Sequence, residues 1–563
     1  MHGQVKVKLP LLIAKEAEKK KLELINEISI KLSKIFAFCR SQSFPQFDQD
    51  IHGAISDILL KEASFLTLWN FRREMLLSLK LKDGVEQFEK FLKKDLILTY
   101  DALKNDPKSY GAWHHRQWVL KNFSAPNFSA EITVCDSALK LDERNFHCWD
   151  FRRFVVERGN ISPLEETKFS DDLIETNFSN FSAWHYRGSL LGKSLNKDQY
   201  LQELDLAHNA IFTDPNDQSP WVYLWCLYSK NKPDPRIIHI SFDDSDRILA
   251  ISFDQVVDRS FLVSSHCFNK DGSAIKSIEL NWISCMPSDW SSTWYTFVPS
   301  SEEYSTDIIF KVTSNDSSVI EFNISSNESP HQIPFLITES LLNIELPSKS
   351  FTKDLVENEI QLINELLELE PNNKWALLTI LKLAHFEDNS KLKPYVSEYL
   401  ELLMKHDPQR CQYYQELKSE LSFVAEINKF LAYANSTDSR PKISFSGLNL
   451  TNLLHLNWLS IVTELDFSKN ALNILPDSIS CLCLLKRLNL DDNLIDNVTW
   501  LPRLRCLEEL SIKRNRINSK QALADALYTS KSIKLVDVTE NPVCSSNEVH
   551  GKWPKSVKII PQL

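Results

Sequence analysis

Residues 105–116 bring together several side chains that could do chemistry. The run reads Asn-Asp-Pro-Lys-Ser-Tyr-Gly-Ala-Trp-His-His-Arg, in which Lys108 supplies a positive point charge and Tyr110 a directional hydroxyl donor. On its position alone, Lys108 would be a solvated turn residue. His114 and His115 are expected to pack and to hydrogen-bond to a neighbouring helix. What these groups can do therefore depends on the elements that position them.

A Trp-x-x-Arg unit ends this run and recurs through the first half of the chain. The units are Trp69/Arg72, Trp113/Arg116, Trp149/Arg152 and Trp184/Arg187, and Trp221 follows with Leu224 in place of the arginine. The i,i+3 spacing puts Trp and Arg on one helix face, and the Asp-Pro, Asn and Ser residues before the unit favour a turn and a helix cap. Recurrence every 35 to 44 residues predicts stacked helix pairs, with Trp in the seam and Arg stacking on rings or gripping carboxylates. On this interpretation the pairs are architecture, and function comes from residues that differ between repeats.

Composition restricts the class of protein. At 563 residues the chain is too long for one core, so two to four domains are expected. A formal charge of -11 offers no basic field, which argues against a nucleic-acid ligand. Because residues 1–8 lack an apolar signal core and no run of about 18 apolar residues occurs, we expect a cytoplasmic protein without a transmembrane segment. Eleven scattered cysteines without Cys-x-x-Cys indicate reduced thiols, and no compact His/Cys/Asp set predicts a zinc site in this chain.

Changes in residue pattern divide the chain into four expected domains. Helical repeats occupy 1–232, beginning with an amphipathic helix over 14–38, and resume over 348–440 with a helix over 354–369. Between them, 233–347 is expected to form a β-sandwich (Ig-like) insertion that interrupts one solenoid. Its short alternating runs lie at 237–242, 249–253, 261–263, 278–280, 294–298 and 308–312.

A third pattern covers 441–563. Leucine-rich stretches there end in Asn470, Asn493, Asn515 and Asn541, which lie 23, 22 and 26 residues apart. This is the period of leucine-rich repeats. The expected fold is therefore multidomain: an α-α superhelical solenoid, interrupted by a β-sandwich insertion and followed by a leucine-rich repeat domain.

The Trp-x-x-Arg repeats resemble those of protein prenyltransferase α subunits. The run Pro-Lys-Ser-Tyr-Gly-Ala-Trp-His-His-Arg over 107–116 resembles the best-marked segment of that family, and 145–150 and 214–219 look like its repeats. The order of helical repeats, β insertion and leucine-rich repeats looks like the Rab-type (type II) geranylgeranyltransferase α subunits, over nearly the whole chain. The domain order discriminates better than any single motif.

This resemblance implies an enzyme that is active only as a heterodimer, a protein geranylgeranyltransferase of type II. The helical repeats would wrap a separate β subunit, an α/α barrel that holds the catalytic zinc and most of the isoprenoid pocket. The pair would transfer geranylgeranyl from geranylgeranyl diphosphate to carboxy-terminal cysteines of Rab GTPases, which an escort protein presents. Donors at the subunit boundary would stabilise the diphosphate leaving group as its negative charge grows.

The resemblance also assigns residues to that boundary. Lys108 and Tyr110 match the positions that reach the diphosphate, and Asn145 and His147 match positions that line the same boundary and are expected to bind substrate. The opening Met-His-Gly resembles the Rab type as well. It implies that His2 folds into the partner's site and ligates the zinc there in an autoinhibited state; a disordered terminus is the alternative.

Two alternatives stay open. The α subunit of a farnesyl or type I geranylgeranyl transferase should lack both added domains, and relatives of that type carry a Gln after the tyrosine to hold the peptide carboxylate. Gly111 stands at that position and has no side chain to do so, which favours the Rab type. A non-catalytic scaffold of tetratricopeptide-like pairs and leucine-rich repeats would explain the domain order without any chemistry. Against it, the tetratricopeptide period is about 34 residues, whereas the Trp-x-x-Arg unit of this chain recurs every 35 to 44 residues.

Overall fold

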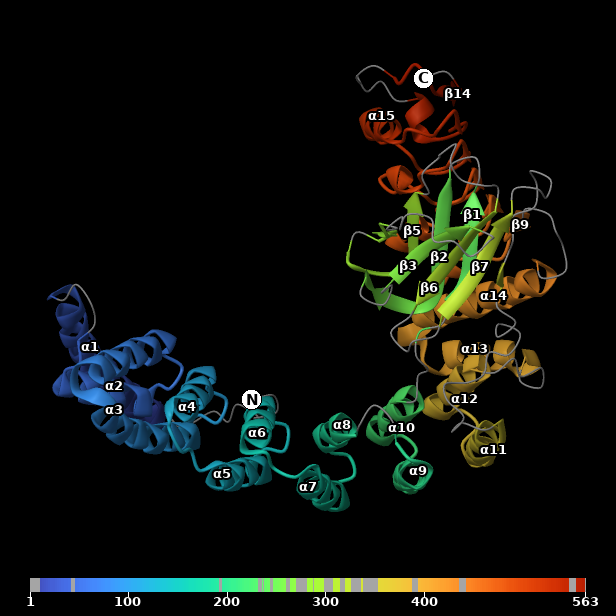
Figure 1. Ribbon diagram of the computed structural model, residues 1–563. Helices are drawn as coiled ribbons and strands as arrows, with labels where there is room; N and C mark the ends of the chain where they lie inside the picture. The colour runs from blue at the N-terminus through green and yellow to red at the C-terminus, as the bar shows by residue number, and fades with distance from the viewer. Residues whose placement is uncertain are drawn as a thin grey trace. The chain divides into compact units, whose positions relative to one another are not determined.

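The structure is a computed structural model (Figure 1). It describes residues 11–41, 46–191, 195–230, 235, 237–243, 247–259, 264–269, 281–286, 288–297, 307–313, 319–325, 336–337, 353–386, 393–434, 442–545 and 553–561. His2 and the expected strands at 261–263 and 278–280 lie outside these residues. The chain divides into two units: one comprises 1–193, 204–211 and 217–227, and the other comprises 194–203, 212–216 and 228–563. Within the described part of the chain, no helix is both long and apolar enough to cross a membrane.

Paired helices form the amino-terminal part of the chain. They are α1 (Leu11–Ser41), α2 (Gln49–Lys61), α3 (Leu66–Asn105), α4 (Tyr110–Asn122), α5 (Phe128–Leu141), α6 (Phe146–Gly159), α7 (Pro163–Thr176), α8 (Phe181–Leu190), α9 (Lys197–Thr213) and α10 (Gln218–Lys230). Helices adjacent in sequence pack together, as α5 does with α6 and α7 with α8 (Figure 1). The expected helix over 14–38 lies within α1, and the helical repeat solenoid is confirmed.

The long helix α3 is two helices joined at Gly84. This residue has φ 82° and ψ 178°. Such angles are essentially restricted to glycine. The segment before Gly84 therefore closes one repeat, and the segment after it opens the next.

The tryptophans of the repeated unit are buried and each fastens a turn. Each indole Nε1 donates to the backbone carbonyl six residues earlier. The pairs are Trp69 to Ala63 (2.9 Å), Trp113 to Pro107 (2.8 Å), Trp149 to Glu143 (2.8 Å) and Trp184 to Phe178 (2.7 Å). One side chain thus fills the seam between helices and satisfies the turn that precedes its own helix.

The arginines of the unit join successive repeats through buried carboxylates. Arg116 donates to Glu131 through Nε (2.7 Å) and Nη2 (2.9 Å), so a helix of one repeat is clamped to the first helix of the next. Arg72 with Asp95 and Arg152 with Glu166 repeat this bidentate contact. Because removing one partner of a buried pair costs about 3–5 kcal/mol, these arginines are architectural, as the sequence predicts.

Antiparallel strands follow α10. They are β1 (Ile237–Asp243), β2 (Ile248–Asp258), β3 (Ser264–Asn269), β4 (Ile283–Ser284), β5 (Trp290–Phe297), β6 (Asp307–Thr313), β7 (Val319–Ser325) and β8 (Leu336–Ile337). One sheet has the order β4-β5-β2-β1-β8 and the other β3-β6-β7. In the register of the first sheet, Ile240 lies opposite Ile251, which lies opposite Trp294.

Helices then resume and pack onto the repeat that precedes the strands. They are α11 (Lys353–Leu369), α12 (Lys374–Phe386), α13 (Lys393–His406) and α14 (Cys411–Ala434). Asn373 Nδ2 donates to the Pro215 carbonyl (3.0 Å), and the Tyr228 hydroxyl donates to Glu359 (2.7 Å). Residues more than a hundred positions apart in the sequence are therefore in contact on either side of the strands.

The carboxy-terminal part is a stack of short parallel strands. They are β9 (Lys442–Ser444), β10 (Glu464–Asp466), β11 (Arg487–Asn489), β12 (Glu509–Ser511), β13 (Leu535–Asp537) and β14 (Lys558–Ile560), and α15 (Lys520–Thr529) lies between β12 and β13. The recurring asparagines form a buried ladder. Asn493 shows the pattern: its Oδ1 accepts from Leu472 N (3.0 Å), and its Nδ2 donates to the Phe467 and Leu490 carbonyls (3.0 Å each). Each turn of the stack is thereby hydrogen-bonded to the one before it.

The first antiparallel sheet packs against this parallel stack. Asn457 Nδ2 donates to the Phe253 carbonyl (2.8 Å), and the Ser252 hydroxyl donates to Ser460 (2.7 Å). Tyr295 belongs to the apolar cluster at the same contact. The contact joins the two β regions of the second unit.

Candidate functional site

A tightly held turn between α3 and α4 carries Lys108 and Tyr110. The Asp106 carboxylate accepts from Lys108 N (3.2 Å), and Ser109 caps α4 by accepting from Ala112 N (3.2 Å). The Ser109 hydroxyl also donates to Ala63 O (2.6 Å). Hydrogen bonds fix the backbone of this turn, while two of its side chains remain accessible: that of Lys108 is 59% exposed, and Tyr110 is 65% exposed.

Lys108 reaches the next repeat. Its Nζ lies 3.2 Å from Oδ2 of Asp142, in the turn between α5 and α6. The Asp142 side chain is 34% exposed. This is a solvent-accessible ion pair, of the kind worth up to about 1 kcal/mol.

Asn145 connects the same two turns. It is 1% exposed and caps α6, where its Oδ1 accepts from His147 N (3.2 Å) and Cys148 N (3.3 Å). Its Nδ2 donates to Pro107 O (2.9 Å), one residue before Lys108. Both ends of the amide are engaged within the chain, so Asn145 fixes the backbone next to Lys108.

His147 packs under Tyr110. The two ring centroids are 4.1 Å apart at an interplanar angle of 83°, and Phe146 flanks the imidazole at 3.9 Å. Burial lowers the pKa of His147; Asp106 and Asp150 oppose the shift, and the Lys108 charge adds to it. This shift favours the neutral imidazole, which packs edge-to-face against the Tyr110 ring. The structure thus brings Lys108, Tyr110, Asn145 and His147 together at the facing ends of α4 and α6.

Comparison with known proteins places this arrangement in a family. The protein prenyltransferase alpha subunit repeat matches residues 92–123, 128–159, 163–194 and 200–231. The geranylgeranyl transferase type-2 subunit alpha of Bos taurus is 32% identical over 590 residues, which cover 100% of this chain and 99% of that protein. The chain belongs to the family of geranylgeranyl transferase type-2 α subunits.

Two other proteins match only part of this chain. The Saccharomyces cerevisiae geranylgeranyl transferase type-2 subunit alpha is 33% identical over 36% of this chain and 66% of its own length. A solved structure, Candida albicans protein geranylgeranyltransferase-I complexed with GGPP, is 21% identical over 36% of this chain and 66% of that chain. The TM-score for this match is 0.31.

In this member of the family, Gly111 has a packing reason. A Cβ at position 111 would lie 2.7 Å from Nε1 of Trp69, closer still to its Cδ1, and 3.2 Å from Ala63 O. Any side chain at this position would clash with the buried indole of Trp69. The lack of a Gln after Tyr110 is therefore also a requirement of the core.

The two histidines after Trp113 differ in environment. His115 is fully buried, and its Nε2 lies 2.7 Å from Oδ2 of Asp95, which confirms the expected packed role. Burial lowers the pKa of His115. His114 is exposed, and its Nδ1 lies 2.8 Å from Nη1 of Arg73 on α3, so it is hydrogen-bonded to a neighbouring helix without being packed.

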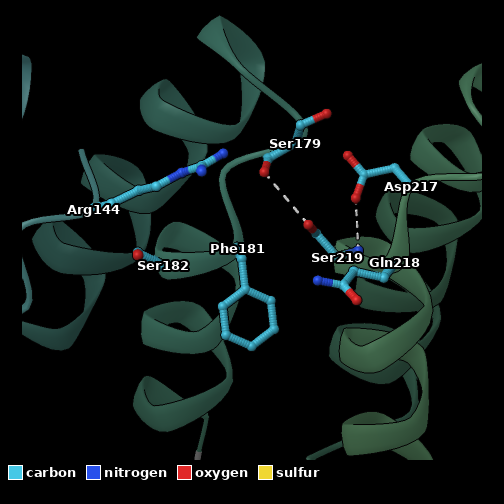
Figure 2. Close-up of a pocket in the computed structure, with 7 residues that line it drawn as sticks. All are labelled: Arg144, Ser179, Phe181, Ser182, Asp217, Gln218 and Ser219. Atoms are coloured by element: carbon cyan, nitrogen blue, oxygen red, sulfur yellow. Dashed lines mark hydrogen bonds between the residues drawn. The ribbon is translucent and has the colours of Figure 1, made fainter. Parts of the chain in front are cut away.

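A cavity of about 480 Å³ lies one repeat further along, and the sequence analysis missed it (Figure 2). It is lined by Arg144, Ser179, Phe181, Ser182, Asp217, Gln218 and Ser219. Ser219 N donates to Asp217 (2.8 Å), and the Ser219 hydroxyl donates to Ser179 O (3.4 Å). One feature of the sequence could have pointed to it: Arg144 occupies the same position in its turn that Lys108 occupies in the previous turn.

Within the part of the chain that the structure describes, no group of three or more His, Cys, Asp or Glu side chains is placed to hold a metal ion. His2, the ligand that the family resemblance implies, lies outside it.

Proposed function

We propose that this chain is the α subunit of a heterodimeric Rab geranylgeranyltransferase. With a β subunit it transfers geranylgeranyl from geranylgeranyl diphosphate to carboxy-terminal cysteines of Rab GTPases presented by an escort protein, in the cytoplasm. The observation that carries this proposal is the 32% identity to a curated type-2 α subunit over the whole of both chains. A farnesyl-type subunit or a non-catalytic scaffold would not account for that full-length match.

Lys108 and Tyr110 are the proposed donors to the diphosphate. Their side chains are exposed on a fixed turn, so a partner and its substrate can reach them. As the bond to the isoprenoid breaks, charge grows on the diphosphate oxygens, and a preorganised ammonium and hydroxyl stabilise it more than they stabilise the bound substrate.

Asn145 and His147 are proposed to complete the substrate-binding boundary. Asn145 supports it through the Pro107 carbonyl. His147 packs edge-to-face against Tyr110 and limits where the phenol ring can lie. Both residues would thus shape the site on which the diphosphate rests.

Zinc is proposed to belong to the β subunit, where it would bind the substrate cysteine as a thiolate nucleophile. His2 of this chain would ligate that zinc in a resting state. Replacing His2 with Ala should then raise the initial rate of transfer and leave the final extent unchanged.

The added regions are proposed to be a β-sandwich (Ig-like) insertion over 233–347 and a leucine-rich repeat domain over 441–563. The antiparallel sheets and the buried asparagine ladder support these assignments. The helical domain would then comprise 1–232 and 348–440.

Co-expression tests the heterodimer, and kinetics test the site. The chain should co-purify with a prenyltransferase β subunit in equal amounts. In that complex Lys108→Ala should lower the single-turnover rate of transfer about 10- to 100-fold, which corresponds to one lost charged hydrogen bond, and Tyr110→Phe by up to about tenfold. Lys140→Ala, an exposed lysine at the end of α5, is the control and should match the unmodified enzyme.

Two results would contradict these proposals. Recovery of the chain without any prenyltransferase β subunit would refute the enzyme assignment. Equal rates for Lys108→Ala and Lys140→Ala would refute the assignment of the diphosphate site.

A further inference from the structure

Successive turns of the helical repeats share one geometry at their first residue. In each turn the side-chain Oδ1 of that residue accepts from the backbone N–H two residues later. The pairs are Asp106 with Lys108 (3.2 Å), Asp142 with Arg144 (3.1 Å), Asn177 with Ser179 (3.2 Å) and Asp214 with Asn216 (3.0 Å). An asparagine performs this role as well as an aspartate does, so the turn itself does not need a carboxylate.

At Asp142 the second carboxylate oxygen has a further partner. Oδ1 is used by the turn, while Oδ2 lies 3.2 Å from Nζ of Lys108. One carboxylate thus ties the lysine head group to the backbone of the next repeat. The lysine stem has four rotatable carbons, and this contact restricts them while leaving most of the side chain in solvent.

The next junction lacks this arrangement and serves as an internal comparison. Arg144 occupies the position equivalent to Lys108, but the residue equivalent to Asp142 is Asn177, which carries no charge. The Asn177 Nδ2 instead donates to Glu143 (2.8 Å). Throughout the described ranges Arg144 makes no ion pair in this structure. The restraint is therefore a property of the junction that holds Lys108, and the repeat architecture does not require it.

We propose that Asp142 is a positioning residue for Lys108, holding the ammonium group where the diphosphate leaving group would meet it. This inference rests on the proposed function of Lys108. Asp142 itself need not touch the substrate, and as an anion it would repel the diphosphate. Its benefit therefore falls on the step in which charge develops, and its removal changes ground-state binding little.

The test uses the heterodimer with its β subunit and compares Asp142→Asn with Asp214→Asn. Both changes preserve the turn hydrogen bond, as Asn177 shows, but only the first removes the partner of Lys108. Asp142→Asn should lower the single-turnover transfer rate about two- to fivefold, the range that an exposed ion pair supports. The dissociation constant for geranylgeranyl diphosphate should stay within about twofold of the original value. Removing the Asp142 charge ends its repulsion of the diphosphate, and this gain offsets the poorer positioning of Lys108. Asp142→Glu should restore part of the rate, and Asp214→Asn should leave it unchanged.

A double-mutant cycle separates positioning from a structural effect. In a Lys108→Ala background, Asp142→Asn should cause no further loss of rate, because its only route to the substrate is gone. An equal loss in both backgrounds would overturn the proposal. So would an unchanged rate for Asp142→Asn in an enzyme that Lys108→Ala slows. If Lys108→Ala itself has no effect, it is the proposed function of Lys108 that fails.

Discussion

Replacing Gly111 with alanine should destabilise the amino-terminal helices, although alanine is the better helix former. Alanine should gain up to about 1 kcal/mol in helix propensity over glycine. Against this gain, the added Cβ would lie within 2.7 Å of Nε1 of Trp69, whose hydrogen bond to Ala63 O measures 2.9 Å. Moving the indole costs about 1–3 kcal/mol in packing and about 1 kcal/mol for the lost hydrogen bond. We expect a net loss of about 2 kcal/mol in the free energy of unfolding.

Thermal unfolding of the full chain, followed by circular dichroism at 222 nm, would measure this loss. For a unit of about 200 residues, 2 kcal/mol lowers the midpoint of its transition by about 4–8 °C. Gly188→Ala is the matched control, because Gly188 is also a buried helical glycine but a Cβ there would be 3.5 Å from the nearest atom, Cys226 Sγ. That variant should unfold at the same temperature as the unmodified chain or above it.

The reasoning would be refuted if Gly111→Ala and Gly188→Ala unfolded at the same temperature. Such a result would mean that Trp69 moves aside without cost. The glycine after Tyr110 would then have no packing reason, and its lack of a carboxylate-binding side chain would be the remaining explanation.

Three further predictions concern other parts of the fold. Gly84→Ala should lower the free energy of unfolding by about 1–3 kcal/mol through backbone strain alone, since nothing lies within 4 Å of the added Cβ. Gly53 is exposed, helical and equally without neighbours, so Gly53→Ala is the control and should cause no such loss in urea unfolding. Burial lowers the pKa of His52 to about 3, so below pH 6.5 the unfolded chain binds a proton that the folded chain does not, and the folded state loses stability as the pH falls. Between pH 7 and pH 5 this loss should be about 2 kcal/mol in urea titrations, and His52→Leu should abolish it. Asn493→Ala should leave the Leu472 amide without its acceptor, while the Phe467 and Leu490 carbonyls each keep one donor, from Asn470 and Asn515. Hydrogen exchange should then show faster opening of β10 and β11 but not of α4.

The helical architecture followed from the sequence because its signal is local. Trp113 and Arg116 are three residues apart on one helix face, and this spacing predicts that the tryptophan fills the seam between helices and that the arginine contacts rings or carboxylates. The arginine's partner was not, because the separation varies: Arg72 meets Asp95 23 residues later, while Arg116 meets Glu131 15 residues later. Fixed turns with helices of unequal length produce this variation, and no single spacing rule can capture it.

The candidate site was predicted in position but not in its internal contacts. Lys108 and Tyr110 were assigned through family resemblance, and the structure places them on an accessible turn. The engagement of Asn145 with Pro107 and the ion pair to Asp142 depend on how neighbouring turns face each other. Such contacts cross from one repeat to the next, so only the three-dimensional register of the stack reveals them.

The contact between Asn373 and Pro215 also has a consequence for the newborn chain. Its two residues are 158 apart in sequence. At ribosomal speeds of about 5–20 residues per second, Asn373 is made about 8–30 s after Pro215. Helix elongation takes nanoseconds per residue. The segment before Pro215 therefore has ample time to become helical before Asn373 exists, and the Pro215 carbonyl stays without this donor through the synthesis of every strand from β1 to β8.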